Sequence, residues 1–189
     1  MNPGDKREMR HRLLVASPML MDPNFYRAVV FVLEHNDEGT IGLVLNDPSD
    51  VILDEVLDGW GPLGGLPGVV FCGGPVETES VIALGRSIGA DDEFYGFQPL
   101  VHGYGLVDLD VSPDDFAGQV DDVRLYVGYA GWGAGQLEEE ITEGAWIVLD
   151  AELGDLTAVK PQQLWSRVLG RQGGPYTQVA LHTDEPWLN

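Results

Sequence analysis

Two apolar segments joined by a short polar turn restrict the fold of this chain more than any other feature. Residues 28–33 read Ala-Val-Val-Phe-Val-Leu, and residues 41–45 read Ile-Gly-Leu-Val-Leu. Between them, residues 36–39 (Asn-Asp-Glu-Gly) have the composition of a tight turn. Apolar runs on either side of such a turn predict a β-hairpin. Because the first run has no polar position, we expect its strand to be buried on both faces.

Strand and helix patterns are mixed along the rest of the chain, without the regular β-α-β-α order of a doubly wound sheet. A strand that is buried on both faces needs cover on each side. We therefore predict an α+β fold, with a bent mixed β-sheet flanked by helices on both sides. The expected strands are residues 13–16, 28–33, 41–45, 69–72, 80–84, 106–107, 123–127 and 146–149, and the expected helices begin near residues 22, 52, 112, 136 and 161.

A glycine-rich stretch, residues 128–135, follows the strand expected at 123–127 and precedes the helix expected over 136–142. Its glycines predict a tight strand-to-helix corner, with Trp132 packed over it. A helix start of this kind can bind phosphate. However, the glycine spacing is not G-x-G-x-x-G, no P-loop lysine follows, and glutamates occupy residues 138–140 in the first helical turn. We therefore favour a structural corner over a nucleotide site.

The charge of the chain restricts its partners. The formal net charge is −21, and residues 1–12 carry a local charge of +2, so the remainder carries −23. DNA-binding surfaces need clustered lysine and arginine to displace counterions. Only six basic residues lie beyond residue 12, scattered between Arg27 and Arg171. Direct nucleic-acid binding is therefore disfavoured, and the same field would repel an anionic membrane.

Length and cysteine usage indicate the organisation and the compartment. At 189 residues, the chain is expected to form a flexible polar tail, residues 1–12, and a single domain, residues 13–189. Cys72 is the only cysteine, so an intramolecular disulfide is impossible and a cytoplasmic location is the simplest expectation. The apolar run after the basic tail is too short for an export signal, and no run is long enough to span a bilayer.

Two short motifs suggest enzymatic or metal chemistry but lack the surroundings that it requires. Residues 85–89 match G-x-S-x-G, yet little helix is expected after them, as a nucleophile elbow needs. Residues 108–119 space their acidic groups like a calcium loop, but Pro113 and Gln119 replace the required glycine and glutamate. Cys72 is expected to be a buried apolar side chain rather than a nucleophile. We therefore expect no cofactor and no metal, and we assign no catalytic residue.

Several sequence blocks, in order, resemble the YqgE/AlgH family. The resemblance extends from Leu13 to Gly174, nearly the whole chain. Its most distinctive block is Tyr-Ala-Gly-Trp at residues 129–132, followed by Gly-Gln-Leu-Glu at residues 135–138. The other matching blocks are residues 14–18, 22–25, 29–30, 34–36, Gly39, 42–46, 71–76, Trp146, 164–165 and 173–174.

This resemblance implies an α+β fold with a bent or bifurcated mixed sheet and flanking helices, as the patterns alone do. The family is largely uncharacterised. One member is named as a regulator of alginate synthesis, and the description "transcriptional regulator" spread from that name. Residues 87–99 depart from the family pattern, so nothing about them is implied. The resemblance establishes no catalytic residue.

Polar and aromatic residues at strand ends predict a cleft beside the hairpin. The simpler interpretation is that such groups only satisfy the hydrogen bonds of turns. In the functional interpretation, the cleft is lined by Asp22, Asn24, Glu34, His35, Asn46, Gly74, Pro75 and Trp132.

Three classes of function fit these features. We favour a non-enzymatic, cytoplasmic module that binds a small ligand or a protein partner, because no nucleophile–base pair or metal spacing is found. The alternative is a hydrolase or transferase that acts on a small molecule in a cleft around His35, with His35 or another residue as the base. The third, a transcriptional regulator, is disfavoured by the net charge. The ligand and the oligomeric state do not follow from the sequence.

Overall fold

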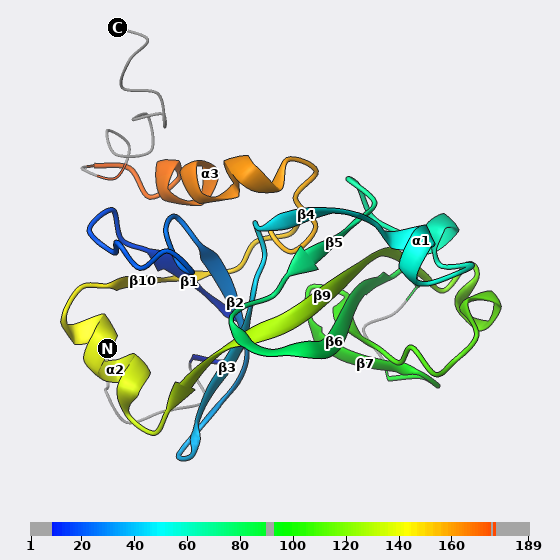
Figure 1. Ribbon diagram of the computed structural model, residues 1–189, viewed down its shortest axis with the longest axis horizontal. Helices are drawn as coiled ribbons and strands as arrows, with labels where there is room; N and C mark the ends of the chain where they lie inside the picture. The colour runs from blue at the N-terminus through cyan, green and yellow to red at the C-terminus, as the bar shows by residue number, and fades with distance from the viewer. Residues whose placement is uncertain (1–8, 90–92, 175, 177–189) are drawn as a thin grey trace, which may run out of the picture.

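The computed structural model describes residues 9–89, 93–174 and 176. Within these residues, ten strands form a curled, largely antiparallel sheet, a half-barrel with few helices (Figure 1). The main strand order is β10-β1-β2-β3-β9-β6-β8-β7, and β5 joins β4 to β9. The strands are β1 (Arg12–Ala16), β2 (Val29–Asn36), β3 (Gly39–Val44), β4 (Pro48–Ile52), β5 (Val69–Cys72), β6 (Val76–Ser87), β7 (Phe97–Val101), β8 (Tyr104–Val107), β9 (Val120–Gly133) and β10 (Trp146–Asp150).

The helices of the described chain are short. They are α1 (Leu53–Val56), α2 (Gln136–Thr142) and α3 (Leu164–Gly170), with 3-10 turns η2 (Gly61–Leu63), η3 (Pro113–Phe116) and η4 (Pro161–Gln163). None of the helices in residues 9–89, 93–174 and 176 has the length and apolar character needed to cross a membrane.

The predicted hairpin is confirmed as β2 and β3, which pair antiparallel across the turn at residues 36–39. The first strand is buried on both faces, as expected. Val29 and Phe31 belong to an apolar cluster that also contains residues of α3. Val30 and Val32 belong to a second cluster, on the other face, that also contains Leu137 of α2. Each face of this half of the sheet is therefore covered by one short helix.

Of the described helices, the other half of the sheet has only the one-turn α1 packed against it, through Leu53, so the prediction of a mixed sheet flanked by helices on both sides is not confirmed. Here β6, β7, β8 and the first part of β9 surround a third apolar cluster. Loops and 3-10 turns close it, with Trp60 packed against Phe116 at a ring-centroid distance of 5.7 Å. Among the strands of the described residues, the one parallel pairing joins β5 to β9, and every other pair is antiparallel.

The glycine-rich stretch is not the corner that the sequence predicted. Strand β9 continues through Gly128 to Gly133, pairing first with β6 and then with β3. The chain turns only at Gly135, which has φ +77° and precedes α2. Of the earlier glycines, Gly128 serves close backbone packing, whereas a Cβ atom on Gly131 or Gly133 would meet only side-chain atoms, at 3.4 Å or more. A Cβ atom on Gly128, whose φ is +69°, would lie 2.5 Å from the carbonyl oxygen of Gly74.

The sheet divides where the end of β5 enters between β3 and β9. The amide of Val44 donates to the carbonyl of Gly73, and the amide of Gly73 donates to the carbonyl of Val127. The next residue, Gly74, has φ +149° and lies directly against the backbone of β9. We call Gly73, Gly74 and Gly128 the glycine crossing. It holds the two halves of the curled sheet together without side chains between the backbones.

Candidate functional site

A row of paired residues brings His35 and Trp132 to the same face of the sheet. His35 pairs with Thr40 between β2 and β3, and Thr40 pairs with Trp132 between β3 and β9. Residues that pair directly across strands point to the same face. All three are buried. The Nδ1 atom of His35 lies 2.7 Å from the Thr40 hydroxyl, and its Nε2 atom lies 3.7 Å from a carboxylate oxygen of Glu138.

One carboxylate joins the aromatic residues beside this row. Glu140 of α2 accepts hydrogen bonds from the indole Nε1 of Trp132 at 2.9 Å and of Trp146 at 2.8 Å. Its other oxygen accepts from the side-chain amide of Gln136 at 2.9 Å. Phe25 stacks on Trp132 and meets Trp146 edge-on, at centroid distances of 5.9 and 5.4 Å. We call Phe25, Trp132, Trp146 and Glu140 the tryptophan cluster.

Replacing the central carboxylate is expected to loosen the tryptophan cluster. In Glu140→Leu, the one oxygen that accepts from both indoles is removed, so two N–H donors lose their partner. The free energy of unfolding should fall by about 2 kcal/mol, measured by urea titration with tryptophan fluorescence. Glu139→Gln, an exposed site on the same helix, removes the same charge and should change little. Equal losses in the two variants would contradict a joining role for Glu140.

Residues 17–27 form a loop that contacts the tryptophan cluster through Phe25. The end of the loop near Arg27 is held by hydrogen bonds, and its middle is exposed. Leu20 and Phe25 pack against the cluster's apolar surroundings. At the base, the side-chain oxygen of Asn46 accepts from the Val29 amide at 2.8 Å, and its nitrogen donates to the Arg27 carbonyl at 2.9 Å. We call this segment the methionine loop, because its Met19 and Met21 are 87% and 74% exposed; Tyr26, on the same loop, is 51% exposed.

The structure gathers five of the eight proposed cleft residues around the methionine loop. Asp22 and Asn24 lie exposed on it, where the Asn24 amide donates to the Asp22 carboxylate at 2.8 Å. Asn46 fixes its base, and His35 and Trp132 lie in the buried layer that contacts Phe25.

The other three lie outside this group. Glu34 forms an ion pair with Arg10 at 3.1 Å, and Gly74 and Pro75 belong to the segment of the glycine crossing. The role of all eight residues in binding stays a prediction. Sequence reasoning missed Met19, Met21, Phe25, Glu140 and Trp146 as parts of one region, because an exposed methionine cannot be told from a buried one by residue type.

The motifs that suggested enzymatic chemistry do not form catalytic geometry in the described part of the chain. Ser87 of the G-x-S-x-G match is the last residue of β6, not a strand-to-helix turn. Asp114 of the calcium-like spacing lies in the 3-10 turn η3. Residues 9–89, 93–174 and 176 also contain no group of three histidine, cysteine or acidic side chains placed to hold a metal ion.

Cys72 is exposed, not buried as the sequence suggested. Its pKa is nonetheless raised, first by partial burial and then by the charge of Asp47 and a hydrogen bond to it. A raised pKa leaves less of the reactive thiolate at neutral pH.

An exposed thiol with a raised pKa should react slowly with a disulfide reagent at pH 7.5. Asp47→Asn removes the neighbouring charge and should increase the rate roughly threefold or more, measured by absorbance under pseudo-first-order conditions. Asp50→Asn, an exposed acid on β4, serves as the control for net charge. If both variants react at the wild-type rate, partial burial alone accounts for the slow reaction.

Most arginines of the described chain contact acidic groups of the same chain. Acidic side chains greatly outnumber basic ones, as the net charge of −21 shows. Many carboxylates therefore have no arginine partner, and the surface is negatively charged. The pairs are Arg10 with Glu34, Arg12 with Asp150, Arg86 with Asp121 and Asp122, Arg167 with Asp155, and Arg171 with Glu152 and Asp155.

Known proteins match this chain along nearly its whole length. The AlgH-like family model, DUF179, matches residues 13–177. A UPF0301 protein of Streptomyces coelicolor is 49% identical over 183 residues, covering 94% of each chain. A UPF0301 protein of Mycobacterium tuberculosis is 41% identical over 184 residues, covering 95% of this chain and 90% of its own.

Solved structures agree with the sequence matches. The crystal structure of protein DIP2367 from Corynebacterium diphtheriae matches with a TM-score of 0.86 and 30% identity, over 95% of this chain and 94% of that one. The solution structure of the AlgH protein from Pseudomonas aeruginosa matches with a TM-score of 0.67 and 30% identity, over 97% and 98%. On its sequence and its fold alike, the chain belongs to the AlgH-like UPF0301 family.

Proposed function

We propose that this protein is a non-enzymatic binding module of the cytoplasm that recognises a protein partner through the methionine loop. The observation that carries the proposal is the exposure of Met19, Met21 and Tyr26 together on one short loop. Single exposed apolar side chains are common on proteins, but neighbouring large ones mark sites of interaction.

The construction of the loop suits docking. Methionine is flexible and polarisable, so it adapts to the surface of a partner. The base of the loop is held by Asn46 and by the stacking of Phe25 on Trp132. An ordered base lowers the entropy that binding must remove, while the methionine side chains remain adaptable.

The charge distribution favours a partner with basic groups near an apolar patch. Within the loop, the exposed carboxylate of Asp22 is balanced by Arg27, whose guanidinium carbon lies 5.5 Å from the centre of the Tyr26 ring, so this preference rests on the charge of −21 of the chain as a whole. Opposite charge on a partner would increase the rate of association. The same charge opposes contact with nucleic acid, so a regulatory role would be exerted through protein contacts.

The chemistry near the loop supports binding rather than turnover. The ring of His35 is buried and lies between Thr40 and Glu138. The carboxylate of Glu140 already accepts three side-chain hydrogen bonds. A general base must reach the proton that it removes from a substrate. Neither group faces a substrate without rearrangement of the cluster.

The test is affinity capture from an extract of the cells that make the protein, with mass spectrometry to identify what is retained. The bait is the wild-type protein, the Met19→Ser/Met21→Ser variant, or Leu153→Ser. Leu153 is exposed outside the loop, so Leu153→Ser controls for lost surface hydrophobicity. A protein retained by wild type and control but not by the double variant is then purified and titrated against each bait.

We expect the double variant to bind the purified partner at least about tenfold more weakly, which corresponds to the loss of one strong apolar contact. Equal affinity for all three baits would reject the methionine loop as the docking site. Turnover of a small molecule by the purified protein, abolished by His35→Gln, would favour the enzymatic alternative instead.

A further inference from the structure

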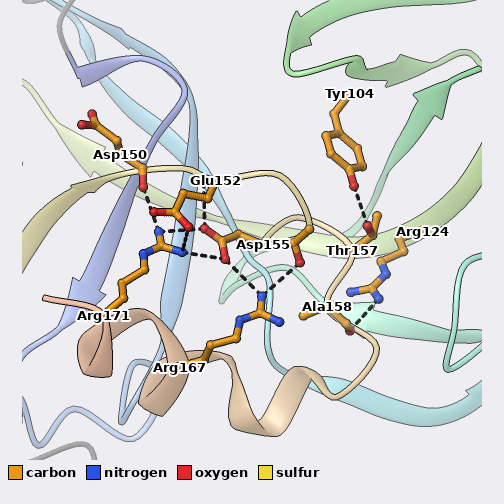
Figure 2. A network of polar contacts seen from close by, with 10 residues as sticks. Tyr104, Arg124, Asp150, Glu152, Asp155, Thr157, Ala158, Arg167 and Arg171 are labelled. Carbon is orange, nitrogen blue, oxygen red and sulfur yellow. Dashed lines mark hydrogen bonds and ion pairs between the residues drawn. The ribbon is translucent and has the colours of Figure 1, made fainter. Parts of the chain in front are cut away.

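A segment between β10 and α3 contacts β8, β9 and the turn before β8. We call residues 151–160 the cover segment. The His102 ring Nε2 lies 3.1 Å from the Ala151 carbonyl, and the Tyr104 hydroxyl lies 2.6 Å from the Thr157 hydroxyl. Figure 2 shows Tyr104 and Arg124 reaching this segment side by side, with Arg124 donating to the Ala158 carbonyl at 2.7 Å.

Arg124 is a buried cation beneath the cover segment. It projects from β9, is 1% exposed and is the largest of the fully buried side chains. Its Nη2 atom donates to the carbonyls of Leu66 and Ala158, and its guanidinium carbon lies 4.9 Å from the centre of the Phe71 ring. These contacts hold the side chain in place, but none of them carries a negative charge.

Three buried polar atoms at this place have no hydrogen-bond partner of good geometry within the described residues, although Arg124 and Tyr126 lie close enough to interact with each other. They are Nε and Nη1 of Arg124 and the hydroxyl of Tyr126, which is two residues away on the same face of β9. Arginine stays protonated in proteins, so both nitrogen atoms are donors that need an acceptor. Gathered donors without acceptors call for a bound group that accepts hydrogen bonds, and a buried charge without a counter-ion favours one that is negatively charged.

The nearby buried ion Asp155 provides a contrast. Its carboxylate is neutralised by Arg167 and Arg171, and both of its oxygens accept hydrogen bonds. For Arg124, no carboxylate of the described chain forms an ion pair. Tyr126 cannot supply the charge, because burial raises its pKa to about 12 even though Arg124 acts to lower it.

We infer that Arg124 and Tyr126 bind a small monovalent anion under the cover segment, either a halide or a short carboxylate such as formate. The anion would accept hydrogen bonds from the guanidinium and from the Tyr126 hydroxyl. Its size is limited because both side chains are enclosed by the cover segment and the apolar residues around Phe71. The site would couple the closure of the cover segment to anion concentration, independently of any partner at the methionine loop.

The test is thermal unfolding at constant ionic strength, with chloride or formate replacing the bulky anion gluconate. An anion that binds only the folded protein should raise Tm by about 5 °C or more once it reaches roughly a hundred times its Kd. A response to formate that exceeds the response to chloride assigns the site to a carboxylate, and the reverse order assigns it to a halide.

Variants of Arg124 and of a surface arginine show which residue is responsible for the dependence of Tm on the anion. Arg124→Met should remove the dependence on the anion, whereas Arg86→Met, which removes a surface arginine paired with Asp121, should keep it. If Arg124→Met does not fold, Tyr126→Phe still tests the site, and it should weaken anion binding several-fold. A Tm in the wild type that ignores the nature of the anion would overturn the inference.

Crystals grown in bromide provide a second readout. We expect an anomalous peak in contact with Nε or Nη1 of Arg124. Density for water alone at this position, both in saturating bromide and in saturating formate, would also overturn the inference.

Discussion

Gly74→Ala is expected to lower the free energy of unfolding by about 4 kcal/mol, or to prevent folding altogether. A Cβ atom at this position would lie 2.2 Å from the carbonyl carbon of Tyr129 and 2.3 Å from the amide nitrogen of Ala130. Both atoms belong to the backbone of β9, which cannot move away without breaking its pairing with β3 and β6. In addition, φ is +149°, a conformation that is almost restricted to glycine.

Gly135→Ala separates the two causes of this loss. Gly135 also has a positive φ, +77°, but a Cβ atom there would meet nothing within 4 Å. We expect Gly135→Ala to lose only about 1 kcal/mol, through backbone strain. Urea titrations of both variants, followed by circular dichroism, measure the difference. Equal losses would show that the glycine crossing is less tightly packed than the distances indicate.

The hairpin was predictable because local and tertiary signals agree in it. Residues 28–33 are apolar at every position, residues 36–39 favour a turn, and burial on both faces follows from the composition alone. Helix α2 was predictable for a similar reason, since Gly135 interrupts the strand and acidic residues follow it. In these segments a short stretch of sequence decides the structure without help from distant residues.

The glycine crossing was not predictable from the sequence. Gly128 favours a turn locally, but in the structure β9 continues through it because β5 and β6 approach from elsewhere in the chain. Position 128 needs a glycine because the backbone of Gly74, 54 positions earlier, lies against it. The sequence around residue 128 does not reveal that contact. Strands β4 and β7 escaped prediction too, since each contains a proline, Pro48 and Pro99, and is stabilised by its neighbours.

The candidate site was predictable only in its buried layer. Strand-end positions suggested His35 and Trp132, and cross-strand pairing places both beside Thr40. The exposed tip was missed, because the burial of Met19 and Met21 depends on what packs against the loop. Burial of that kind is decided by tertiary contacts, and residue type does not reveal it.

Asp155 connects the cover segment to α3 through hydrogen bonds and ion pairs. Its replacement tests how much these contacts stabilise the cover segment. The side chain is 3% exposed. It accepts hydrogen bonds from Arg167 at 3.0 Å, from Arg171 at 3.0 and 2.8 Å, and from the amide of Glu152 at 2.8 Å (Figure 2). One carboxylate therefore joins two turns of the helix to the start of the cover segment.

Asp155→Ala is expected to lower the free energy of unfolding by about 3 kcal/mol. Removing one partner of a buried pair leaves the others without compensation. Breaking a buried ion pair costs roughly 3–5 kcal/mol, and the loss here should lie at the lower end of that range. Arg167 is half exposed, so water can hydrate it, and Arg171 keeps its contact with Glu152. Hydrogen exchange should accelerate first in the cover segment and α3, while β2 and β3 stay protected.

Asp150→Ala is the matched control, since it removes the same charge from an ion pair with Arg12 in which the carboxylate is 87% exposed. Exposed pairs contribute less than about 1 kcal/mol, and the lost negative charge offsets part of that by reducing repulsion in a strongly acidic chain. If the two variants lose equal stability and exchange alike, Asp155 does not hold the cover segment. A selective loss in Asp155→Ala, with anion dependence also reduced, would tie closure of that segment to the buried charge of Arg124.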